Sequence, residues 1–472
     1  MFGFVTRAAA VAVCVLGING LTFADKITVD GSDLTDSDGR VVILHGVNVV
    51  YKHYPWHPSA HQFGVQDADL IKQMGMNSVR LGCLWAGVNP VEGSYNSSYL
   101  DEIERIVDML NEKDIYVLLD FHQDLGNEMF GGEGFPTWAV NTWGFDPWCY
   151  PKGTPWALKY YQPGVMATFQ SLYWNLDGIQ DAYVNSWKQV ATRFKDKPNL
   201  LGYELINEPF PGLFFLDPSW APAQLEPFYE ELIPAIRDID SQTPIFFQNS
   251  GGASDTDHTV RPDGSGLVYS SHSYCFSLLR GLLHIETWPE CCKDELYKQI
   301  IEEAYVIAQM QQPPVPMVMT EFGATHQKGE LLAATGIAEK FFIGWMYWGW
   351  KYWEDPTGNP DEPLAKGDGK DVKLIPGKAK LLTRIYADRI SGSPVSTIFE
   401  VDGMFNLKYI PDSTISEPTQ IQIPALLNWR GMEIDVEGGT YTNSPDRSKI
   451  WVTPAVNSDH VSVTITGSPR GR

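Results

Sequence analysis

The chain has 472 residues, of which 43% are hydrophobic and 20% are charged. This is the composition of a globular protein with a sizeable core, and it excludes extended disorder. Because 58 Asp and Glu outnumber 35 Lys and Arg, the formal charge is −23, which repels phosphate backbones and makes a nucleic-acid partner unexpected.

The first residues are typical of an export signal. Arg7 precedes an uncharged, largely apolar run from Ala8 to Leu21, and small residues follow at Thr22 and Ala24. This pattern predicts a signal peptide over residues 1–24 and hence a secreted or lumenal protein, for which a digestive or lysosome-like compartment would suit the acidic composition. The alternative, a membrane anchor, would require an apolar run of roughly 20 residues.

Five cysteines follow the predicted cleavage site, and an odd number in an oxidising compartment leaves at least one thiol unpaired. Adjacent Cys291 and Cys292 are poorly placed to pair with each other. The pairing therefore stays open among Cys83, Cys149, Cys275, Cys291 and Cys292. No spacing of Cys and His resembles a zinc site.

Short apolar, β-branched runs then alternate with helical patterns, as in parallel strands joined by crossover helices. Helices are predicted at Tyr99–Glu112 and Gln180–Phe194, and a further one at Asp69–Gly75 ends on a glycine. Eight strands are expected, at Val42–Val49, Ser78–Leu81, Tyr116–Asp120, Leu201–Ile206, Pro244–Gln248, Leu267–Ser270, Val315–Thr320 and Ile343–Tyr347. This α/β pattern predicts a TIM (β/α)8 barrel with insertions over residues 25–388.

The pattern changes near Ser391, where short alternating runs are separated by Pro, Gly, Asn and Asp turns. The runs that predict strands include Ser396–Val401, Gln420–Pro424, Ile450–Thr453 and Val461–Ile465. We therefore expect an all-β module over residues 389–472, which either seals the barrel or helps to present a ligand.

Polar residues follow most of the predicted barrel strands, at the end where a barrel of this kind carries its site. Glu208 follows the fourth strand and Glu321 the seventh, on opposite sides of the barrel mouth. Glycosidic cleavage requires two such carboxyls, one as proton donor and one as nucleophile. A single glutamate in such a place is more often a helix cap or a solvated charge, so the pair carries the argument. The other polar or aromatic residues at strand ends are Arg80, His122, Asp124, Asn207, His272, Tyr274 and Trp348.

These residues resemble those of the family 5 glycoside hydrolases, a retaining group with its acid/base after strand four and its nucleophile after strand seven. Asn207-Glu208-Pro209 is similar to the group's Asn-Glu-Pro signature, and Thr320-Glu321-Phe322-Gly323 is similar to its nucleophile segment. The resemblance spans Ile27 to Arg384 and includes, in order, Arg80, His122, His272, Tyr274 and Trp348. It implies Glu208 as acid/base and Glu321 as nucleophile, and we expect neither a metal nor an organic cofactor.

The resemblance also suggests how the neighbouring side chains act. Ionised Glu321 disfavours a second negative charge close by, which keeps Glu208 protonated until the glycosyl ester has formed. We expect Arg80 and Tyr274 to hold Glu321 ionised, and Asn207 to donate to the sugar 2-hydroxyl. The sugar subsite beside the cleaved bond would be shaped by His122, His272 and Trp348. For each histidine, a satisfied position in the core is the alternative.

Within family 5 the chain most resembles endoglycoceramidases, which cut between the oligosaccharide and the ceramide of glycosphingolipids. The resemblance rests on Val47–Lys52, Asp120–Asp124, Gly202–Pro209 and the stretch around Gly134-Phe135-Pro136-Trp138, and a C-terminal β-sandwich fits the same group. We therefore expect a retaining endo-glycosidase that acts on gangliosides and related glycosphingolipids. The alternatives are a hydrolase of glucosylceramide or steryl glucoside, a β-glucan endoglucanase, and a non-catalytic secreted glycolipid-binding protein.

Apolar residues near Glu208 favour a lipid substrate. The loop Pro209–Leu216 follows Glu208 directly, and an exposed apolar loop is costly unless it packs or binds something apolar. The insertion after the third strand adds Trp138, Trp143, Trp148, Trp156 and Trp174. These indoles either form the core of the insertion, line a groove for acyl chains, or touch a membrane or micelle surface.

On the sugar side, Lys52 and Asp124 are expected near the first sugar. Lys52 either meets a sialic acid or is a surface lysine, and Glu354 and Asp355 are expected to be solvated. The sequence does not indicate the oligomeric state.

Overall fold

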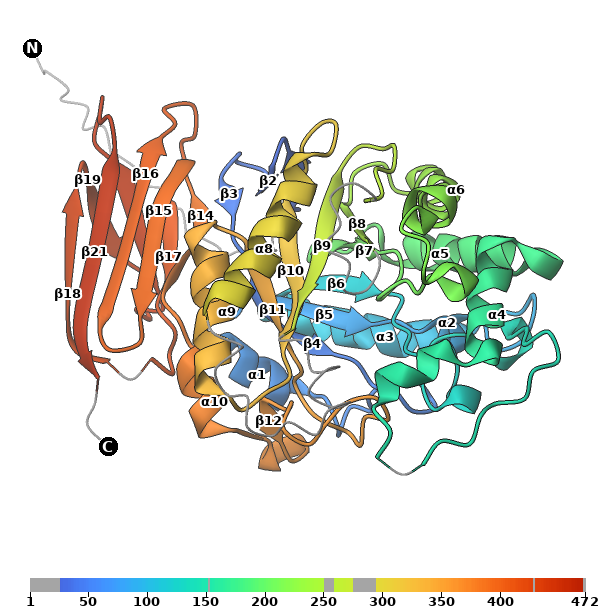
Figure 1. Ribbon diagram of the computed structural model, residues 1–472. Coiled ribbons are helices and arrows are strands. Elements are labelled where there is room, and N and C mark those ends of the chain that lie inside the picture. The colour runs from blue at the N-terminus through green and yellow to red at the C-terminus, as the bar shows by residue number, and fades with distance from the viewer. Residues whose placement is uncertain (1–25, 152, 250–258, 275–293, 428, 470–472) are drawn as a thin grey trace, which may run out of the picture.

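The computed structural model describes residues 26–151, 153–249, 259–274, 294–427 and 429–469 (Figure 1). The predicted signal peptide lies outside these residues, as do Cys275, Cys291 and Cys292. Of the two cysteines that are described, Cys83 is buried and Cys149 is exposed, and both are free thiols. None of the described helices is long and apolar enough to cross a membrane.

Eight parallel strands close into a barrel, which confirms the predicted fold class. In sequence order they are β4 (His45–Val49), β5 (Ser78–Gly82), β6 (Tyr116–Asp120), β7 (Leu200–Glu204), β8 (Ile245–Gln248), β9 (Leu267–Ser273), β10 (Met317–Gly323) and β11 (Gly344–Trp348). Each overlaps one of the eight predicted strands.

The helices of the described residues lie around the barrel (Figure 1). They are α1 (Val65–Gln73), α2 (Trp85–Val88), α3 (Ser97–Asn111), α4 (Pro163–Tyr173), α5 (Ile179–Phe194), α6 (Glu226–Arg237), α8 (Asp294–Gln309), α9 (Lys328–Lys340) and α10 (Pro376–Leu382). The side chain of Asn96 caps α3 by accepting a hydrogen bond from the backbone N–H of Tyr99. The three helices predicted from apolar spacing correspond to α1, α3 and α5, whereas α4 lies in the insertion after β6.

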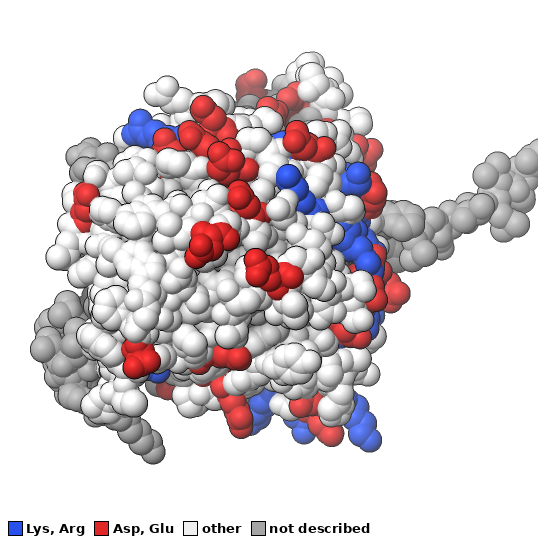
Figure 2. Space-filling view, turned by 90° about the vertical axis from the view of Figure 1, so that its right-hand side faces the viewer, with Lys and Arg blue, Asp and Glu red and all other residues white. Residues whose placement is uncertain are grey.

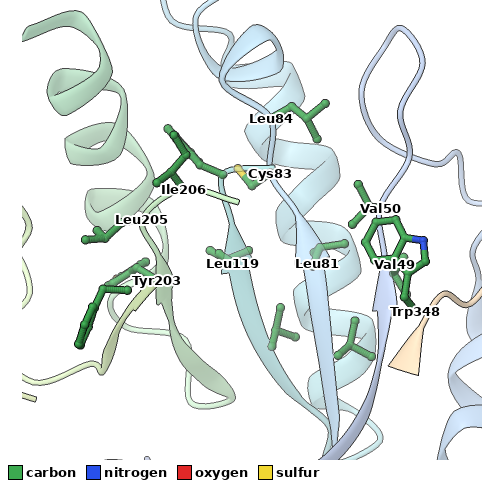
Figure 3. Close-up of a cluster of buried hydrophobic side chains, with 14 of the residues drawn as sticks. Val49, Val50, Leu81, Cys83, Leu84, Leu119, Tyr203, Leu205, Ile206 and Trp348 are labelled. Carbon is green, nitrogen blue, oxygen red and sulfur yellow. The ribbon is translucent and has the colours of Figure 1, made fainter. Parts of the chain in front are cut away.

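Alternation along the barrel strands separates apolar side chains from polar ones. Figure 3 shows Val49, Leu81, Leu119 and Tyr203, which come from the four successive strands β4 to β7 and are fully buried. The residues directly before or after them in sequence point to the opposite face, are polar and converge at the barrel mouth, namely Asn48, Arg80, Asp120 and Glu204. The same pattern that builds the core therefore positions the polar site.

The C-terminal module consists of two sheets, at the left of Figure 1. The seven-stranded sheet comprises β1 (Thr28–Asp30), β2 (Asp33–Thr35), β3 (Val41–Val42), β14 (Tyr386–Ile390), β17 (Thr419–Gln422), β20 (Lys449–Pro454) and β19 (Gly439–Asn443). The four-stranded sheet comprises β15 (Gly392–Glu400), β16 (Met404–Pro411), β21 (Val461–Pro469) and β18 (Trp429–Glu437). Leu407 and Val463 pack with Ile421 and Val452 in a shared core, as in a β-sandwich.

The N-terminal strands depart from the predicted boundary of the barrel. Although residues 25–388 were assigned to the barrel, β3 pairs with β14, so β1 to β3 belong to the sandwich sheet. The predicted strand Val42–Val49 is accordingly divided between β3 and β4. Ile27 and Leu34 pack with Leu118 and other apolar side chains inside the barrel. This packing closes one end of the barrel, which apolar periodicity alone did not reveal.

Candidate active site

Arg80 is fully buried at the barrel mouth and connects the polar residues of the site. Its Nη1 lies 2.5 Å from Oε1 of Glu321, and its Nη2 donates to Oδ1 of Asn207 at 2.7 Å. Burial lowers the pKa of Arg80, but the neighbouring carboxylates raise it above its ordinary value. The guanidinium is therefore a permanent cation beneath the pocket. Its other polar contacts are with Asn48, Asp120 and Glu204.

Glu321 lies on β10, and each of its carboxyl oxygens accepts a hydrogen bond. Besides Arg80 at Oε1, the hydroxyl of Tyr274 donates to Oε2 at 2.8 Å. Burial and the negative charge of Glu321 raise the pKa of Tyr274 well above its ordinary value, so this hydroxyl stays a donor. Two donors of this kind stabilise a carboxylate and fix its orientation.

Glu208 lies on the loop after β7 and faces Glu321 across the mouth. Its φ of 38° is in the left-handed region, and its side chain is 23% exposed. One carboxyl oxygen of Glu208 and one of Glu321 lie within 4.8 Å of each other. This proximity fits the separation of about 5 to 5.5 Å that retaining glycosidases use, and not the roughly 6.5 to 9.5 Å of inverting ones.

His272 lies between the two glutamates. Its Nδ1 is 2.7 Å from Oε1 of Glu208 and 3.4 Å from Oε2 of Glu321. Burial lowers the pKa of His272, but the carboxylates of Glu321 and Glu208 raise it above its ordinary value. The core-residue alternative is therefore wrong for His272.

Lys52 forms a second charged group in the barrel mouth. Its ammonium is buried, at 2.6 Å from Asp124, 2.7 Å from the Thr357 hydroxyl and 3.0 Å from Asp355. An ammonium has three hydrogens, and these partners account for all of them in the free protein. The interpretation of Lys52 as a surface lysine is therefore wrong, and its contact with a sialic acid stays a prediction. The prediction of a solvated side chain was right for Glu354 and wrong for buried Asp355.

Trp348 and His122 flank this group. The Lys52 ammonium lies 4.6 Å from the centroid of the Trp348 ring, and that ring stacks on His122 with centroids 5.3 Å apart. Nδ1 of His122 is 2.7 Å from Oδ2 of Asp120. Burial lowers the pKa of His122, but the negative charge of Asp120 raises it more strongly, and the resulting pKa is about 10. The imidazolium therefore extends the charged group, and the role of His122 in the sugar subsite stays a prediction.

The described residues contain two groups of acids and histidines whose ligand atoms are close enough for a metal ion. They are Glu208 with His272 and Glu321, and His122 with Asp124 and Glu133. In each group a protein cation, Arg80 or Lys52, already lies against a carboxylate. The absence of a metal requirement stays a prediction.

Comparison with known proteins agrees with this geometry. Residues 35–354 match the family described as cellulase (glycosyl hydrolase family 5), and residues 384–466 match the glycoside hydrolase family 5 C-terminal domain. The chain belongs to glycosyl hydrolase family 5.

Several relatives of this family 5 chain are named endoglycoceramidase. Endoglycoceramidase I from Rhodococcus hoagii (strain 103S) is 30% identical over 456 residues, which cover 92% of this chain and 87% of that protein. Endoglycoceramidase from Cyanea nozakii is 38% identical over 253 residues, which cover 47% of this chain and 50% of that protein. The chain thus spans about half the length of the Cyanea relative.

A solved structure of endo-glycoceramidase II from Rhodococcus sp. in complex with ganglioside GM3 has a TM-score of 0.78 to this chain. It is 25% identical, and the match covers 94% of this chain and 100% of the other. A second structure of that enzyme, a lactosyl-enzyme intermediate, has a TM-score of 0.75 at 25% identity and covers 93% and 100%.

Three polar residues of this family 5 site escaped the sequence analysis. Gln248 ends β8, a strand for which no end residue was considered, and Glu204 ends β7 but lies inside the predicted strand Leu201–Ile206. Glu133 is fully buried 3.8 Å from Lys52, with no described hydrogen-bond partner for either carboxyl oxygen. Burial raises the pKa of Glu133 well above its ordinary value.

The two glycines that flank Glu133 in the sequence could have indicated its buried position. A Cβ on Gly132 would lie 1.8 Å from the backbone oxygen of Asp124, and one on Gly134 would lie 2.4 Å from Cβ of Gln123. The Gly-Glu-Gly sequence is therefore what lets Glu133 approach Asp124.

An apolar face adjoins the barrel mouth. Trp143, Trp148 and Trp174 are 40%, 55% and 46% exposed, whereas Trp138 and Trp156 pack against the core. In the loop after Glu208, Phe215 and Leu216 are 39% and 83% exposed. The indoles of Trp143 and Trp174 stack, and Tyr161 contacts Phe215, so the insertion and the loop form one surface. Figure 2 shows a broad area with few charged residues at the left and centre of the side of the molecule that carries α4 and α5.

Proposed function

We propose that this family 5 chain is a retaining endo-glycosidase that hydrolyses the β-glycosidic bond between the oligosaccharide and the ceramide of glycosphingolipids. The observation that carries the proposal is the pair Glu208 and Glu321, with carboxyl oxygens within 4.8 Å, next to an apolar loop that begins directly after Glu208. The similarity to endoglycoceramidase I over 92% of the chain supports the choice of a glycosphingolipid.

In the first step, a carboxylate oxygen of Glu321 attacks the anomeric carbon while the bond from that carbon to the ceramide oxygen breaks. Glu208 donates its proton to the departing oxygen, so ceramide leaves as the neutral alcohol. Arg80 and Tyr274 hold Glu321 in place for this attack. One Nδ2 hydrogen of Asn207 is bonded to the Gln123 carbonyl, which leaves the second for the sugar 2-hydroxyl.

In the second step, Glu208 accepts a proton from water while the water oxygen attacks the anomeric carbon. The ester bond to Glu321 breaks and releases the free oligosaccharide. Glu321 is then again a carboxylate, and Glu208 is again protonated. The lactosyl-enzyme intermediate of the Rhodococcus enzyme supports a covalent route of this kind.

The Lys52 group supplies the sugar-binding side of the pocket. Asp124 and Asp355 form ion pairs with Lys52, and the ring of Trp348 lies against the same ammonium. Carboxylates accept hydrogen bonds from sugar hydroxyls, and an aromatic ring packs against an apolar sugar face. We assign the inner sugars of the head group to this side, and the ceramide to the side of the Pro209–Leu216 loop.

The exposed aromatic face supports contact with a membrane or micelle surface. Trp and Tyr are enriched where one end of a side chain is apolar and the other is wet, and the face adjoins the loop assigned to ceramide. Export through the signal peptide over residues 1–24, to a secreted or lumenal location, completes the proposal.

A substrate panel tests this function. Release of an intact oligosaccharide from ganglioside GM3 or lactosylceramide, with no action on carboxymethyl cellulose, is the expected result. Action on carboxymethyl cellulose alone would instead establish an endoglucanase, and action on glucosylceramide or a steryl glucoside alone would establish a simple lipid glycosidase.

Glu321→Gln tests the catalytic assignment. The variant should lose turnover by a factor on the order of 10⁴ or more while it retains substrate binding. Glu354→Gln, at an exposed carboxyl of the same pocket region, is the matched control and should keep wild-type turnover. Equal turnover in Glu321→Gln and wild type would leave a non-catalytic glycolipid-binding protein as the function.

A further inference from the structure

Gln248 lies at the end of β8, beneath both Glu208 and His272. It is 2% exposed, and its side-chain amide contacts three elements of the site. Its Oε1 accepts a hydrogen bond from the backbone N–H of Glu208 at 2.8 Å. Its Nε2 lies 2.8 Å from Oε1 of Glu204 and 2.8 Å from Nε2 of His272.

Two contacts determine which end of this amide is the donor. The backbone N–H of Glu208 is always a donor, so it requires the amide oxygen of Gln248. The carboxylate of Glu204 is an acceptor, so it requires the amide NH2. The reversed orientation would place donor against donor at Glu208 and acceptor against acceptor at Glu204.

The oriented amide determines the protonation of His272. Because the NH2 group faces Nε2 of the imidazole, that nitrogen has to be an acceptor and carries no hydrogen. The remaining hydrogen of a neutral imidazole is then on Nδ1, which donates to Oε1 of Glu208. An imidazolium would instead direct its Nε2–H at the amide NH2.

The charged groups around His272 act in opposing directions. The carboxylates of Glu321 and Glu208 favour an imidazolium, and Arg80 opposes it. The neutral hydroxyl of Tyr274 donates to Glu321, one of these carboxylates. Once Glu208 is protonated, its negative charge no longer favours the imidazolium. The orientation of the Gln248 amide then adds to the opposition from Arg80.

The Glu208–His272 pair has two alternative places for one proton. Besides the Nδ1–H between the residues, the acid-competent state holds one more proton, either on Nε2 of His272 or on the Glu208 carboxyl. We propose that Gln248 is a positioning residue that keeps His272 neutral and thereby leaves this proton on Glu208, where the departing oxygen needs it. This inference rests on the proposed role of Glu208 as acid/base.

Gln248→Glu tests the inference with a nearly unchanged shape. A carboxylate at this position still accepts from the Glu208 backbone, and its second oxygen replaces the amide NH2 between Glu204 and Nε2 of His272. That oxygen can accept from an Nε2–H, and the added negative charge beside Glu204 favours an imidazolium, so the proton moves to the imidazole. For a glycosphingolipid, whose alkoxide leaves poorly without a proton, kcat/KM should fall about 10²-fold or more. For a dinitrophenyl glycoside of the same oligosaccharide, whose leaving group needs no proton, the loss should be below about fivefold.

A second variant and a control protect this comparison from effects on folding. Gln248→Met removes the hydrogen bonds to Glu208, Glu204 and His272 without adding a charge near Glu204, and it should show the same dependence on the leaving group. Gln242→Glu makes the same chemical change at an exposed position just before β8, and it should behave as wild type. Equal losses for the two substrates in both Gln248 variants would overturn the inference.

Nitrogen-15 NMR of the histidine side chains observes the proton directly, with the His272 signals assigned by their loss in His272→Gln. In the wild type at the pH of maximal activity, Nε2 of His272 should be unprotonated, and in Gln248→Glu both ring nitrogens should be protonated. An imidazolium in the wild type would contradict the inference.

Glu208→Gln separates the two proposals. If its loss of kcat/KM does not depend on the leaving group, the acid/base role of Glu208 fails. If it shows this dependence and the Gln248 variants do not, only the role of Gln248 fails.

Discussion

Nη1 of Arg80 lies 2.5 Å from Oε1 of Glu321, and both side chains are buried. The same guanidinium also contacts Asp120 and Glu204, so three carboxylates share one cation. Removing one partner of a buried charge pair leaves the other charge unsatisfied, which is strongly destabilising.

Arg80→Met should therefore reduce the free energy of unfolding by about 3 to 5 kcal/mol, as measured by denaturant titration. Arg80→Lys keeps the charge but not the forked geometry, and it should lower kcat by about 10²-fold in protein that remains folded. A kcat within threefold of wild type for Arg80→Lys would contradict the assigned role in holding Glu321.

Lys52 offers a comparison between a buried and an exposed ion pair. Lys52→Met leaves Asp124 and Asp355 without their cation, so we expect a loss of about 3 to 5 kcal/mol in the free energy of unfolding. Lys113→Met removes the exposed pair with Asp69, whose side chains are 27% and 43% exposed, and should cost about 1 kcal/mol or less. Equal losses in the two variants would count against a buried charge network around Lys52.

The pKa of His122 predicts how stability depends on pH. Because its pKa of about 10 in the folded protein exceeds the ordinary value of 6.5, its protonation stabilises the fold fully below pH 6.5, and this contribution disappears as the pH rises through 10. The free energy of unfolding should fall across this range, and His122→Gln should show a smaller fall. His326→Gln, at an exposed histidine, should retain the wild-type slope. Identical slopes in wild type and His122→Gln would refute the prediction.

The exposed aromatic face predicts a role in binding lipid surfaces. Variants of this face should affect hydrolysis at such a surface but not the hydrolysis of a soluble substrate. Trp148→Ser combined with Leu216→Ser should weaken binding to phosphatidylcholine vesicles that contain a glycosphingolipid, and should slow hydrolysis there by about tenfold, since each exposed apolar group contributes to interfacial binding. Turnover of a soluble dinitrophenyl glycoside should not change. Val456→Ser alters a 91% exposed apolar residue of the C-terminal module and serves as control. Unchanged vesicle binding in the double variant would exclude this face as the contact surface.

The barrel was predictable because its strands are short apolar runs and its site residues follow them. Glu208 and Glu321 were found in this way, and their proximity follows from barrel closure. The contacts within the mouth were harder to predict from the sequence. Lys52 and Asp355, for example, form an ion pair although almost the whole barrel sequence separates them. No local pattern distinguishes a carboxylate that turns into the barrel, such as Asp355, from its exposed neighbour Glu354.

The N-terminal strands were misplaced for a related reason. Each is two or three residues long, too short for an alternating pattern, and their partner β14 lies beyond the entire barrel. Gln248 was missed because its importance depends on the Glu208 backbone and the His272 ring, which only the fold brings together.

The pairing of β3 with β14 has a consequence for how the protein is made. During synthesis, β1 to β3 emerge first but have no sheet to join until the ribosome has passed β14. Since domains otherwise tend to fold in order from the N-terminus, the barrel has to assemble while β3 still lacks its partner β14. A barrel expressed without the C-terminal module would remain in that incomplete state. The two units therefore form one folding unit, and we expect their unfolding transitions to coincide.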